Sequence, residues 1–184
     1  MERGWRGIVY IATSVDGYIA RNDGDIAWLT DPDSSIEHPG AVPGPGIRAS
    51  YDELMTRVDV LVMGRGTYEK VLSFNSWPYS IPVIVLSTTV PATQDERVTV
   101  VRTMDAALAE LSRRQPRGVY VDGGKTIRTF LAADLIDEIT LTRAPVLIGD
   151  GIALFEALAI DVQLSLQAVQ ADGGYLMSRY EVVR

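Results

Sequence analysis

Two short glycine-containing segments carry the residue types that bind phosphate groups. The first consists of Gly64, Arg65, Gly66 and Thr67, which follow an apolar run and precede a stretch that can be helical. Glycine lets the backbone approach a phosphate closely, the start of a helix offers unpaired N–H groups, and an arginine adds a charge-assisted hydrogen bond. The sequence therefore favours phosphate binding at this turn over an ordinary connection between a strand and a helix.

The second segment consists of Gly123, Gly124, Lys125 and Thr126, directly after the apolar run at 119–121. Its spacing does not match the phosphate loop of nucleoside triphosphate-binding proteins, because Gly118 lies one residue too early. No G-x-G-x-x-G follows a strand, so the usual dinucleotide fingerprint is also missing. Two separate turns still suit an extended nucleotide laid across strand ends. Close packing of a helix on a strand at Gly123 is the alternative.

Acidic residues stand at two places where chemistry or helix capping could use them. Asp16 lies in a Ser-Val-Asp-Gly sequence after the first apolar run, where a carboxylate can contact a substrate or handle a proton. The alternative is an Asx turn, in which Asp16 accepts a hydrogen bond from its own loop. Asp52 and Glu53 resemble an acid pair. However, Ser50 stands three residues before Glu53 as in a capping box, so we assign Glu53 to capping.

Two hydroxyl groups add a third candidate binding position, and the histidine and cysteine content excludes several kinds of catalytic and metal site. Ser87 and Thr88 follow the apolar run at 83–86 and add hydroxyl groups at a third strand end. His38 is the only histidine, so we expect neither a histidine-based triad nor a metal site built from several histidines. The absence of cysteine excludes a disulfide scaffold, a thiol nucleophile and an iron–sulfur cluster.

The charge balance and the apolar runs limit the partners that we expect. The chain has 17 basic and 24 acidic residues, and its formal charge of −7 opposes binding to a phosphate backbone. No apolar run approaches the roughly 20 residues of a membrane span. The N-terminal apolar run has no small-residue cleavage site after it, so it does not indicate a secretory signal. We therefore expect a cytoplasmic protein without nucleic-acid or membrane partners.

Alternation of apolar runs and helical stripes indicates an α/β fold. Apolar residues at consecutive positions are typical of strands that are covered on both faces, as in a largely parallel sheet. Such runs occupy 8–12, 60–63, 83–86, 98–101 and 119–121. Apolar residues at helical spacing lie between them, at 51–58, 104–111 and 127–131. Two alternating runs, 162–170 and 175–183, flank a Gly-Gly sequence and predict an antiparallel hairpin at one edge of the sheet.

The length of 184 residues suits one domain that spans 1–184 and buries its own core. Two segments do not follow the strand and helix patterns. Residues 38–46 contain three prolines and three glycines, which predicts a surface loop. Residues 16–31 follow the first strand and include Trp28 among glycines and aspartates. Loops after strand ends line the ligand crevice of open α/β sheets, so this segment is a candidate lid.

These motifs together resemble the dihydrofolate reductase superfamily. The resemblance is closer to the reductase domain of bacterial bifunctional riboflavin deaminase-reductases and to the free-standing relatives of that domain. The segments that carry the resemblance span most of the chain in the family order: ATSVDGYIA at 12–20, DIAWLT at 25–30, DVLVMGRGTYE at 59–69, VIVLSTT at 83–89 and VDGGKTIRTFLAADLIDEITLTRAPVLIGDG at 121–151. None of these 184 residues resembles the zinc deaminase half of the bifunctional proteins.

The resemblance implies a three-layer α/β/α fold, with a mixed, mostly parallel sheet, that holds NADPH across the carboxyl ends of the strands. It assigns Gly64, Arg65, Gly66 and Thr67 to the pyrophosphate and the adenosine side, and Ser87 and Thr88 to the adenosine ribose and its 2′-phosphate. Gly123, Gly124, Lys125 and Thr126 would form the second phosphate turn. Ala12, Ile19 and Ala20 would border the nicotinamide, with the segment up to Trp28 as the lid.

The resemblance also implies a small heterocyclic substrate and a homodimer. It makes Asp16 the leading catalytic and substrate-contacting residue and places Trp28, Tyr51 and Asp52 at the substrate. The activity implied is NADPH-dependent reduction of the 5-amino-6-(5-phosphoribosylamino)uracil reductase type. We find no basic cluster reserved for a phosphoribosyl group, however. Reduction of dihydrofolate is an alternative within the enzymes, and a non-catalytic nucleotide- or flavin-binding protein is the alternative outside them.

Overall fold

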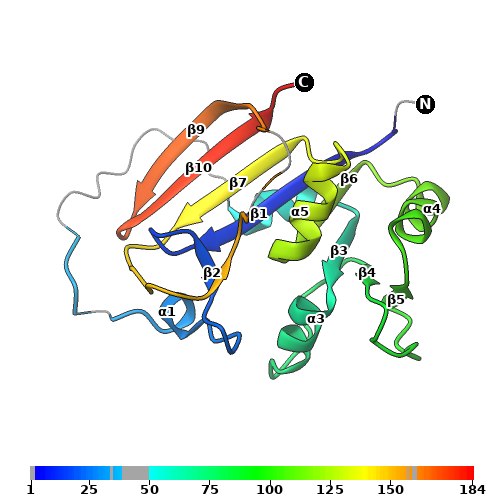
Figure 1. The fold of residues 1–184 in the computed structure, drawn as a ribbon, viewed down its shortest axis with the longest axis horizontal. Helices are drawn as coiled ribbons and strands as arrows, with labels where there is room; N and C mark the ends of the chain where they lie inside the picture. Colours follow the sequence, from blue (N-terminus) through cyan, green and yellow to red (C-terminus); the bar gives the residue numbers. More distant parts are fainter. Residues whose placement is uncertain (1–2, 34, 39–49, 157, 159–160) are drawn as a thin grey trace.

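A single large sheet of eight strands, in the order β5-β4-β3-β6-β1-β7-β10-β9, organises the molecule (Figure 1). The structure is a computed structural model and describes residues 3–33, 35–38, 50–156, 158 and 161–184. The strands of this sheet are β1 Arg6–Thr13, β3 Val60–Gly64, β4 Val83–Leu86, β5 Val98–Val101, β6 Gly118–Asp122, β7 Glu138–Arg143, β9 Leu164–Asp172 and β10 Tyr175–Val182. The helices are α1 Ala27–Thr30, α2 Tyr51–Arg57, α3 Arg65–Leu72, α4 Met104–Arg114 and α5 Gly124–Ala132.

The direction of the strands agrees with the expectation from their sequences. All strands from β5 to β7 along the sheet pair in parallel, and β10 pairs antiparallel with both β7 and β9. The consecutive apolar runs thus form the parallel part, where both faces are covered. The alternating runs form the edge hairpin, whose turn uses Gly173 and Gly174 at φ of 52° and 82°. These predictions are confirmed.

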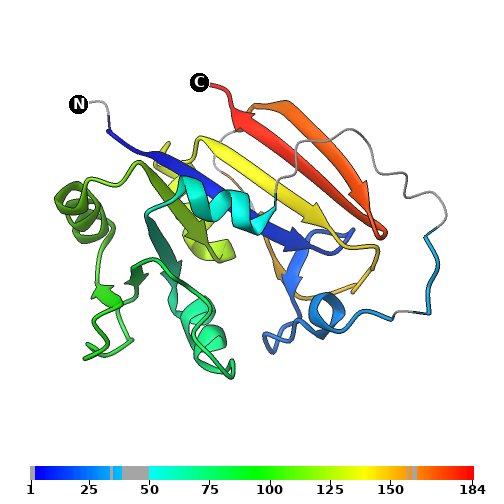
Figure 2. The same ribbon diagram turned by 180° about the vertical axis from the view of Figure 1, so that it is seen from behind.

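Helices cover both faces of the parallel part, and alternate residues of each strand point to opposite cores. Val60 and Val62 pack in one cluster with residues of α4 and α5, whereas Leu61 and Met63 pack in a second cluster with residues of α2 and α3. Accordingly, α5 lies in front of the sheet in Figure 1 and α2 lies in front in Figure 2. The buried residues of β3 therefore belong to two layers, as a three-layer fold requires.

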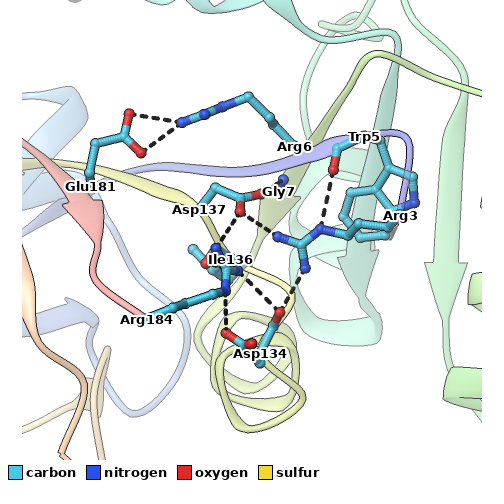
Figure 3. A network of polar contacts seen from close by, with 9 residues as sticks. All are labelled: Arg3, Trp5, Arg6, Gly7, Asp134, Ile136, Asp137, Glu181 and Arg184. Atoms are coloured by element: carbon cyan, nitrogen blue, oxygen red, sulfur yellow. Dashed lines mark hydrogen bonds and ion pairs between the residues drawn. The ribbon is translucent and has the colours of Figure 1, made fainter. Parts of the chain in front are cut away.

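Ionic contacts join the two ends of the chain at the amino end of the parallel strands (Figure 3). Arg184 pairs with Asp134 and with Asp137, each at 2.8 Å. Arg3 donates to the Asp134 carbonyl at 2.7 Å and also pairs with Asp137. The second oxygen of Asp137 accepts a hydrogen bond from the amide of Gly7 at 2.7 Å. The first residues of β1 and the end of β10 are thereby held to the segment before β7.

The segment predicted as a loop at 16–31 contains regular structure. Its β2, Tyr18–Ala20, pairs with β8, Ile152–Ala153, and α1 follows. The sequence could not show this pairing, because the two strands are very short and far apart along the chain. The predicted loop at 38–46 lies outside the described residues from 39 onward. Within the part of the chain that is described, none of the helices has the length and hydropathy needed to cross a membrane.

Candidate cofactor and substrate site

The two glycine turns lie next to each other at the carboxyl ends of β3 and β6. These strands are neighbours, and Met63 is in register with Asp122. Helix α3 begins immediately after Gly64, and α5 begins immediately after Gly123. The topology therefore brings together two helix N-termini that are far apart in the sequence.

Each turn packs its threonine against the glycine of the other turn. A Cβ added at Gly64 would lie 2.8 Å from the Thr126 hydroxyl oxygen, and a Cβ at Gly123 would overlap the Thr67 hydroxyl. Gly123 also has a φ of +88°, which favours glycine. Close packing at Gly123, the alternative to phosphate binding, is thus present, but the contact is with the other turn. The start of α3 stays open, since a Cβ at Gly66 would meet nothing within 4 Å, whereas Gly124 at the start of α5 is buried against Ile19, Arg128 and the Ala153 carbonyl.

The N-termini of α3 and α5 have the properties of an anion site. Neither Gly64 nor Gly123 supplies a side-chain cap, and no acidic residue lies in the first turn of either helix. The first N–H groups of a helix lack partners within the helix and carry a partial positive charge. Arg65 and Lys125 are exposed beside them. The residues of these two turns fit the pyrophosphate of a dinucleotide.

The turn after β4 is fixed beside Arg65. The Ser87 hydroxyl accepts hydrogen bonds from the amides of Thr89 and Val90 at 3.2 and 3.1 Å, so it is buried in its own turn. Thr88 is exposed. Arg65 donates to the Thr89 hydroxyl at 3.4 Å. Thr88, Thr89 and Arg65 are therefore exposed groups of this turn region that a ligand can reach.

Arg102, which the sequence analysis did not single out, holds the same turn from behind. Its guanidinium donates to the carbonyl of Ser87 at 2.8 Å and to that of Val90. Nothing in its sequence context indicates this role, because it follows β5 rather than the strand whose turn it supports.

The residues expected at the nicotinamide lie on β1 and β2. Ile19 approaches the second glycine turn, since a Cβ at Gly124 would lie 3.1 Å from its terminal methyl group. Ala20 is buried and Ala12 is partly buried near the end of β1. Arg128 of α5 donates to the carbonyl of Ala153 at 3.0 Å and thereby ties the small β2–β8 sheet to α5. This contact places the expected lid segment against the start of α5.

Asp16 links two loops. Its carboxylate accepts hydrogen bonds from the amides of Ile148 at 3.3 Å and Gly149 at 2.8 Å, rather than from its own loop only. A hydrogen bond from the Ser14 hydroxyl, followed by those from Gly149 and Ile148, lowers the pKa of Asp16. Asp16 is therefore ionised at neutral pH and is suited to positioning the 146–149 loop rather than to donating a proton.

We expect Asp16→Asn to reduce kcat by roughly ten- to hundredfold, because a small displacement of loops beside a reacting group has effects of this size. The affinity for NADPH should change little, since the phosphate turns are on other strands. Steady-state kinetics and a cofactor titration measure both quantities. Asp31→Asn, at an exposed position of the same segment, is the control. Unchanged kinetics in Asp16→Asn would contradict the role.

Asp122 is the acidic residue that the structure adds to the site. It ends β6, and one of its oxygens accepts a hydrogen bond from the amide of Gly123 at 2.8 Å. Burial raises the pKa of Asp122 to about 6, and the Gly123 hydrogen bond opposes this only in part. The sequence signal was an aspartate directly before a Gly-Gly pair at a strand end. The same position was interpreted only as part of the glycine turn.

Of the expected substrate residues, the structure brings Tyr51 to Asp122. Tyr51 is the first residue of α2, and the centroid of its ring lies 6.2 Å from that of Tyr10. Burial is the main cause that raises the pKa of Tyr51, and the charge of Asp122 is the second. Asp52 is exposed on the same helix turn. The Ser50 hydroxyl accepts from the Glu53 amide at 3.2 Å, which confirms Ser50 as the cap of α2. The reciprocal half of the capping box is not formed, because the Glu53 carboxylate lies 3.6 Å from Arg179 instead.

Trp28, the remaining residue expected at the substrate, is buried on α1. Its indole N–H has no hydrogen-bond partner among the described residues. A buried donor without a partner is uncommon, so this group can serve a ligand. The described residues contain no group of three or more histidine, aspartate or glutamate side chains that could hold a metal ion.

The fold and the two paired turns define a dihydrofolate reductase-like α/β protein. The dihydrofolate reductase of Enterococcus faecalis, solved with NADP(H) and RAB-propyl, matches 99% of this chain and 98% of its own, with a TM-score of 0.62 and 16% identity. A Thermotoga maritima diaminohydroxyphosphoribosylaminopyrimidine deaminase/5-amino-6-(5-phosphoribosylamino)uracil reductase matches 97% of this chain and 57% of its own, with a TM-score of 0.67 and 16% identity. At these identities the likeness establishes the fold.

The chain belongs to the family described as the RibD C-terminal domain, whose model matches residues 6–177. A crystal structure from Shewanella sp. PV-4, whose name assigns it provisionally to riboflavin biosynthesis, matches 97% of this chain and 99% of its own. Its TM-score is 0.81 and its identity is 38%. The resemblance inferred from the sequence and the expected fold class are both confirmed, and reductases are among the relatives of this chain.

Proposed function

We propose that this protein is an NADPH-dependent reductase that transfers hydride to a C=N or C=O bond of a pyrimidine- or pterin-like heterocycle. The first reaction to consider is of the riboflavin type, in which the ribosyl group of a ribosylaminouracil becomes ribityl. The single observation that carries the proposal is the pairing of two uncapped helix N-termini beside the Asp122 carboxyl group, whose pKa is raised by burial to about 6. The family supports it.

The residues of the two turns would hold the cofactor, and bound NADPH would supply the hydride. The N–H groups at the starts of α3 and α5 would bind its pyrophosphate. Arg65 and Thr88 would contact the adenosine 2′-phosphate. The nicotinamide would be bordered by Ala12, Ile19 and Ala20, which would exclude water from it. Strand β2 is held in place there because it pairs with β8, whose Ala153 carbonyl accepts a hydrogen bond from Arg128 of α5.

Asp122 would handle the proton that accompanies the hydride. Its raised pKa, about 6, lets the carboxyl group exist in both forms near neutral pH, as a general acid requires. The lowered pKa of Asp16 makes that residue a poor proton donor. We therefore assign proton transfer to Asp122 and loop positioning to Asp16.

The proposal is tested by the absorbance of NADPH at 340 nm in the presence of 5-amino-6-ribosylaminouracil, its 5′-phosphate or dihydrofolate. Loss of absorbance that requires a ribosylaminouracil supports the proposal. Turnover of dihydrofolate alone would favour the second enzyme activity. Tight retention of nucleotide without turnover of any of the three would favour a binding protein instead.

Arg65→Ala is expected to weaken NADPH binding about ten- to a hundredfold and NADH binding much less. A hydrogen bond between charged groups contributes about 1.5–3 kcal/mol, and only NADPH carries the 2′-phosphate. Fluorescence titration with both cofactors measures the two affinities. Lys70→Ala, in the last turn of α3, removes the same charge at the far end of the helix and should leave both unchanged. Equal weakening of NADH and NADPH would remove Arg65 from this role.

We also propose a homodimer and a cytoplasmic location, as the resemblance implies. Strand β9 forms the edge of the sheet, and its exposed apolar side chains are Leu164, Leu166 and Val169. An edge strand without charged residues over most of its length is suited to contact with a second copy. The proposed chemistry does not depend on this contact.

A further inference from the structure

Two segments that are far apart in the sequence form one unit around the small β2–β8 sheet. We call residues 14–22 and 146–154 together the β2–β8 unit. The Val15 amide donates to the Val146 carbonyl at 2.8 Å, β2 pairs with β8 further along, and the Asp16 carboxylate accepts from two amides of the second segment. The first half of the candidate lid therefore keeps its position only together with the second segment.

Close packing and a side-chain hydrogen bond extend this unit beyond β2. The side-chain amide of Asn22 donates to the Asp150 carboxylate at 2.7 Å. A Cβ added at Gly151 would overlap the Ala20 carbonyl oxygen, so the two segments are in direct backbone contact there. A side chain at Gly151 would push the two segments apart.

Arg128 of α5 binds the β2–β8 unit through two consecutive backbone carbonyl groups. One nitrogen of its guanidinium donates to the Ala153 carbonyl at 3.0 Å and to the Leu154 carbonyl at 3.1 Å. A second nitrogen lies 3.2 Å from the carboxylate of Glu156, whose side chain is 62% exposed. An ion pair with so exposed a partner contributes little to stability. The two carbonyl groups therefore fix the position of the guanidinium.

The same guanidinium lies beside the first turn of α5. A Cβ added at Gly124 would be 3.2 Å from a terminal nitrogen of Arg128 and 3.3 Å from the Ala153 carbonyl oxygen. Side chains on a helix point back toward its N-terminus, which explains how Arg128 of the second turn reaches the first. Its positive charge therefore adds to that of the α5 N-terminus, where the second phosphate turn lies.

Ile19 connects this contact to the expected position of the nicotinamide. It lies on β2 within the β2–β8 unit, and its terminal methyl group would be 3.1 Å from a Cβ at Gly124. The distance between Ile19 and a bound cofactor thus depends on how firmly the unit is held against α5. Arg128 acts on this distance through the unit.

We infer that Arg128 is a positioning residue that couples an anion at the start of α5 to the holding of the β2–β8 unit against this helix. An anion there is attracted most strongly when Arg128 occupies the position in which it also binds Ala153 and Leu154. The anion therefore stabilises the held unit, and the held unit strengthens anion binding in turn, because coupling between two sites is reciprocal. The inference rests on the proposed function for the identity of the anion, which is the cofactor pyrophosphate.

Hydrogen exchange of the full chain, measured by mass spectrometry without ligand, with NADPH and with inorganic pyrophosphate, tests the coupling. In the wild-type protein we expect NADPH to slow exchange in the β2–β8 unit at least about threefold, and pyrophosphate to act on the same peptides. Arg128→Met keeps most of the apolar stem but removes the charge and the donors, so this ligand-induced protection should disappear. Protection of the first turn of α3 reports in each sample that the ligand is bound.

Two further variants distinguish coupling from a structural role. Arg128→Lys keeps the charge and a donor, so it should retain part of the protection. Arg113→Met makes the same substitution at an exposed position of α4 and should retain all of it. A merely structural Arg128 would speed exchange without ligand but leave the ligand-induced factor unchanged in Arg128→Met, and this result would overturn the inference.

The result for the coupling is separable from the result for the proposed function. Protection that depends on Arg128, without NADPH oxidation by any of the three substrates, would support the coupling and overturn the proposed reduction. NADPH oxidation without ligand-induced protection of the β2–β8 unit would do the reverse. Absence of both would overturn both.

A change inside the β2–β8 unit tests the coupling from the other side. Gly151→Ala pushes the two segments apart away from both phosphate turns, so we expect it to weaken NADPH binding at least about threefold. In the Arg128→Met background the same change should weaken binding no further. Gly173→Ala, in the turn between β9 and β10, is the control, and Asn22→Ala loosens the same contact if Gly151→Ala does not fold. Additive effects of Gly151→Ala and Arg128→Met would overturn the inference.

Discussion

Asp122→Asn is expected to lower kcat by about 10²- to 10⁴-fold, the range found when a general acid is removed. The amide keeps the size of the side chain and can still accept the hydrogen bond from the Gly123 amide, so the turn should stay in place. The affinity for NADPH should therefore change less than about threefold. Stopped-flow and steady-state measurements of NADPH oxidation separate the two effects. A kcat within threefold of the wild-type value would remove Asp122 from proton transfer.

The pH profile gives a second result for the same residue. Only the protonated carboxyl group can donate, and burial raises the pKa of Asp122 to about 6. The kcat of the wild-type protein should therefore fall above pH 6, approaching tenfold for each pH unit. Asp122→Asn should lose this limb of the profile. Retention of the same limb in the variant would assign the titration to another group.

The stability that depends on Asp122 should fall with rising pH, as activity does, whereas removal of the carboxyl group should lower activity and raise stability. Folding raises the pKa of Asp122 from 3.8 to about 6, so the folded state disfavours its charged form. The contribution of the neutral carboxyl group is present at low pH and is lost as the pH rises from about 4 through 6. A shift of about two units corresponds to at most about 3 kcal/mol, and partial exposure of the carboxyl group reduces this.

Thermal unfolding of Asp122→Asn measures this response and confirms that the variant folds. Its Tm should exceed that of the wild-type protein at pH 8, by up to about 10 °C for a chain of this length, and should match it at pH 3.5. If replacing a residue stabilises the fold but abolishes turnover, that residue is kept in the protein for its role in catalysis. A lower Tm at pH 8 would indicate that Asp122 has a structural role instead.

Most of the fold could be predicted from the sequence, because the order of apolar and polar residues indicates which faces of each strand and helix are buried. The consecutive apolar runs of β3 and β6 require cover on both faces, and these strands occupy the centre of the parallel sheet. Alternation of apolar and polar residues, together with Gly173 and Gly174, predicted the edge hairpin. The pairing of β2 with β8 had no such signal, since two or three residues cannot show a period.

The site could be predicted only in parts, because its geometry depends on the order of strands. The glycine turns were identified separately, but their mutual packing requires β3 to lie beside β6, which no local pattern states. Asp122 was missed for the same reason. Its pKa is raised by burial, which depends on how the elements around the end of β6 pack and not on the residues next to it in the sequence. In contrast, the hydrogen bond at Ser50 is local, and the capping pattern predicted it correctly.

Gly123→Ala is expected to have the largest effect on cofactor binding. Alanine at a φ of +88° is strained by roughly 1–2 kcal/mol. Its Cβ would also overlap the Thr67 hydroxyl, so α3 and α5 would have to separate or Thr67 would have to rotate. We expect a Tm lower by about 5–15 °C, from a total of roughly 2–4 kcal/mol, and an affinity for NADPH reduced at least about tenfold. Differential scanning fluorimetry and fluorescence titration measure these changes.

Two comparisons separate the steric contact from the backbone strain. Gly173 in the β9–β10 turn also has a positive φ, +52°, but open space around its Cβ position, so Gly173→Ala should lower the Tm without weakening NADPH binding. Thr67→Ala removes the hydroxyl that the new Cβ would meet. In the double variant Gly123→Ala/Thr67→Ala, part of the lost affinity should therefore return, giving a coupling of about 0.5–3 kcal/mol. Strict additivity of the two changes would show that the turns do not act as one anion site.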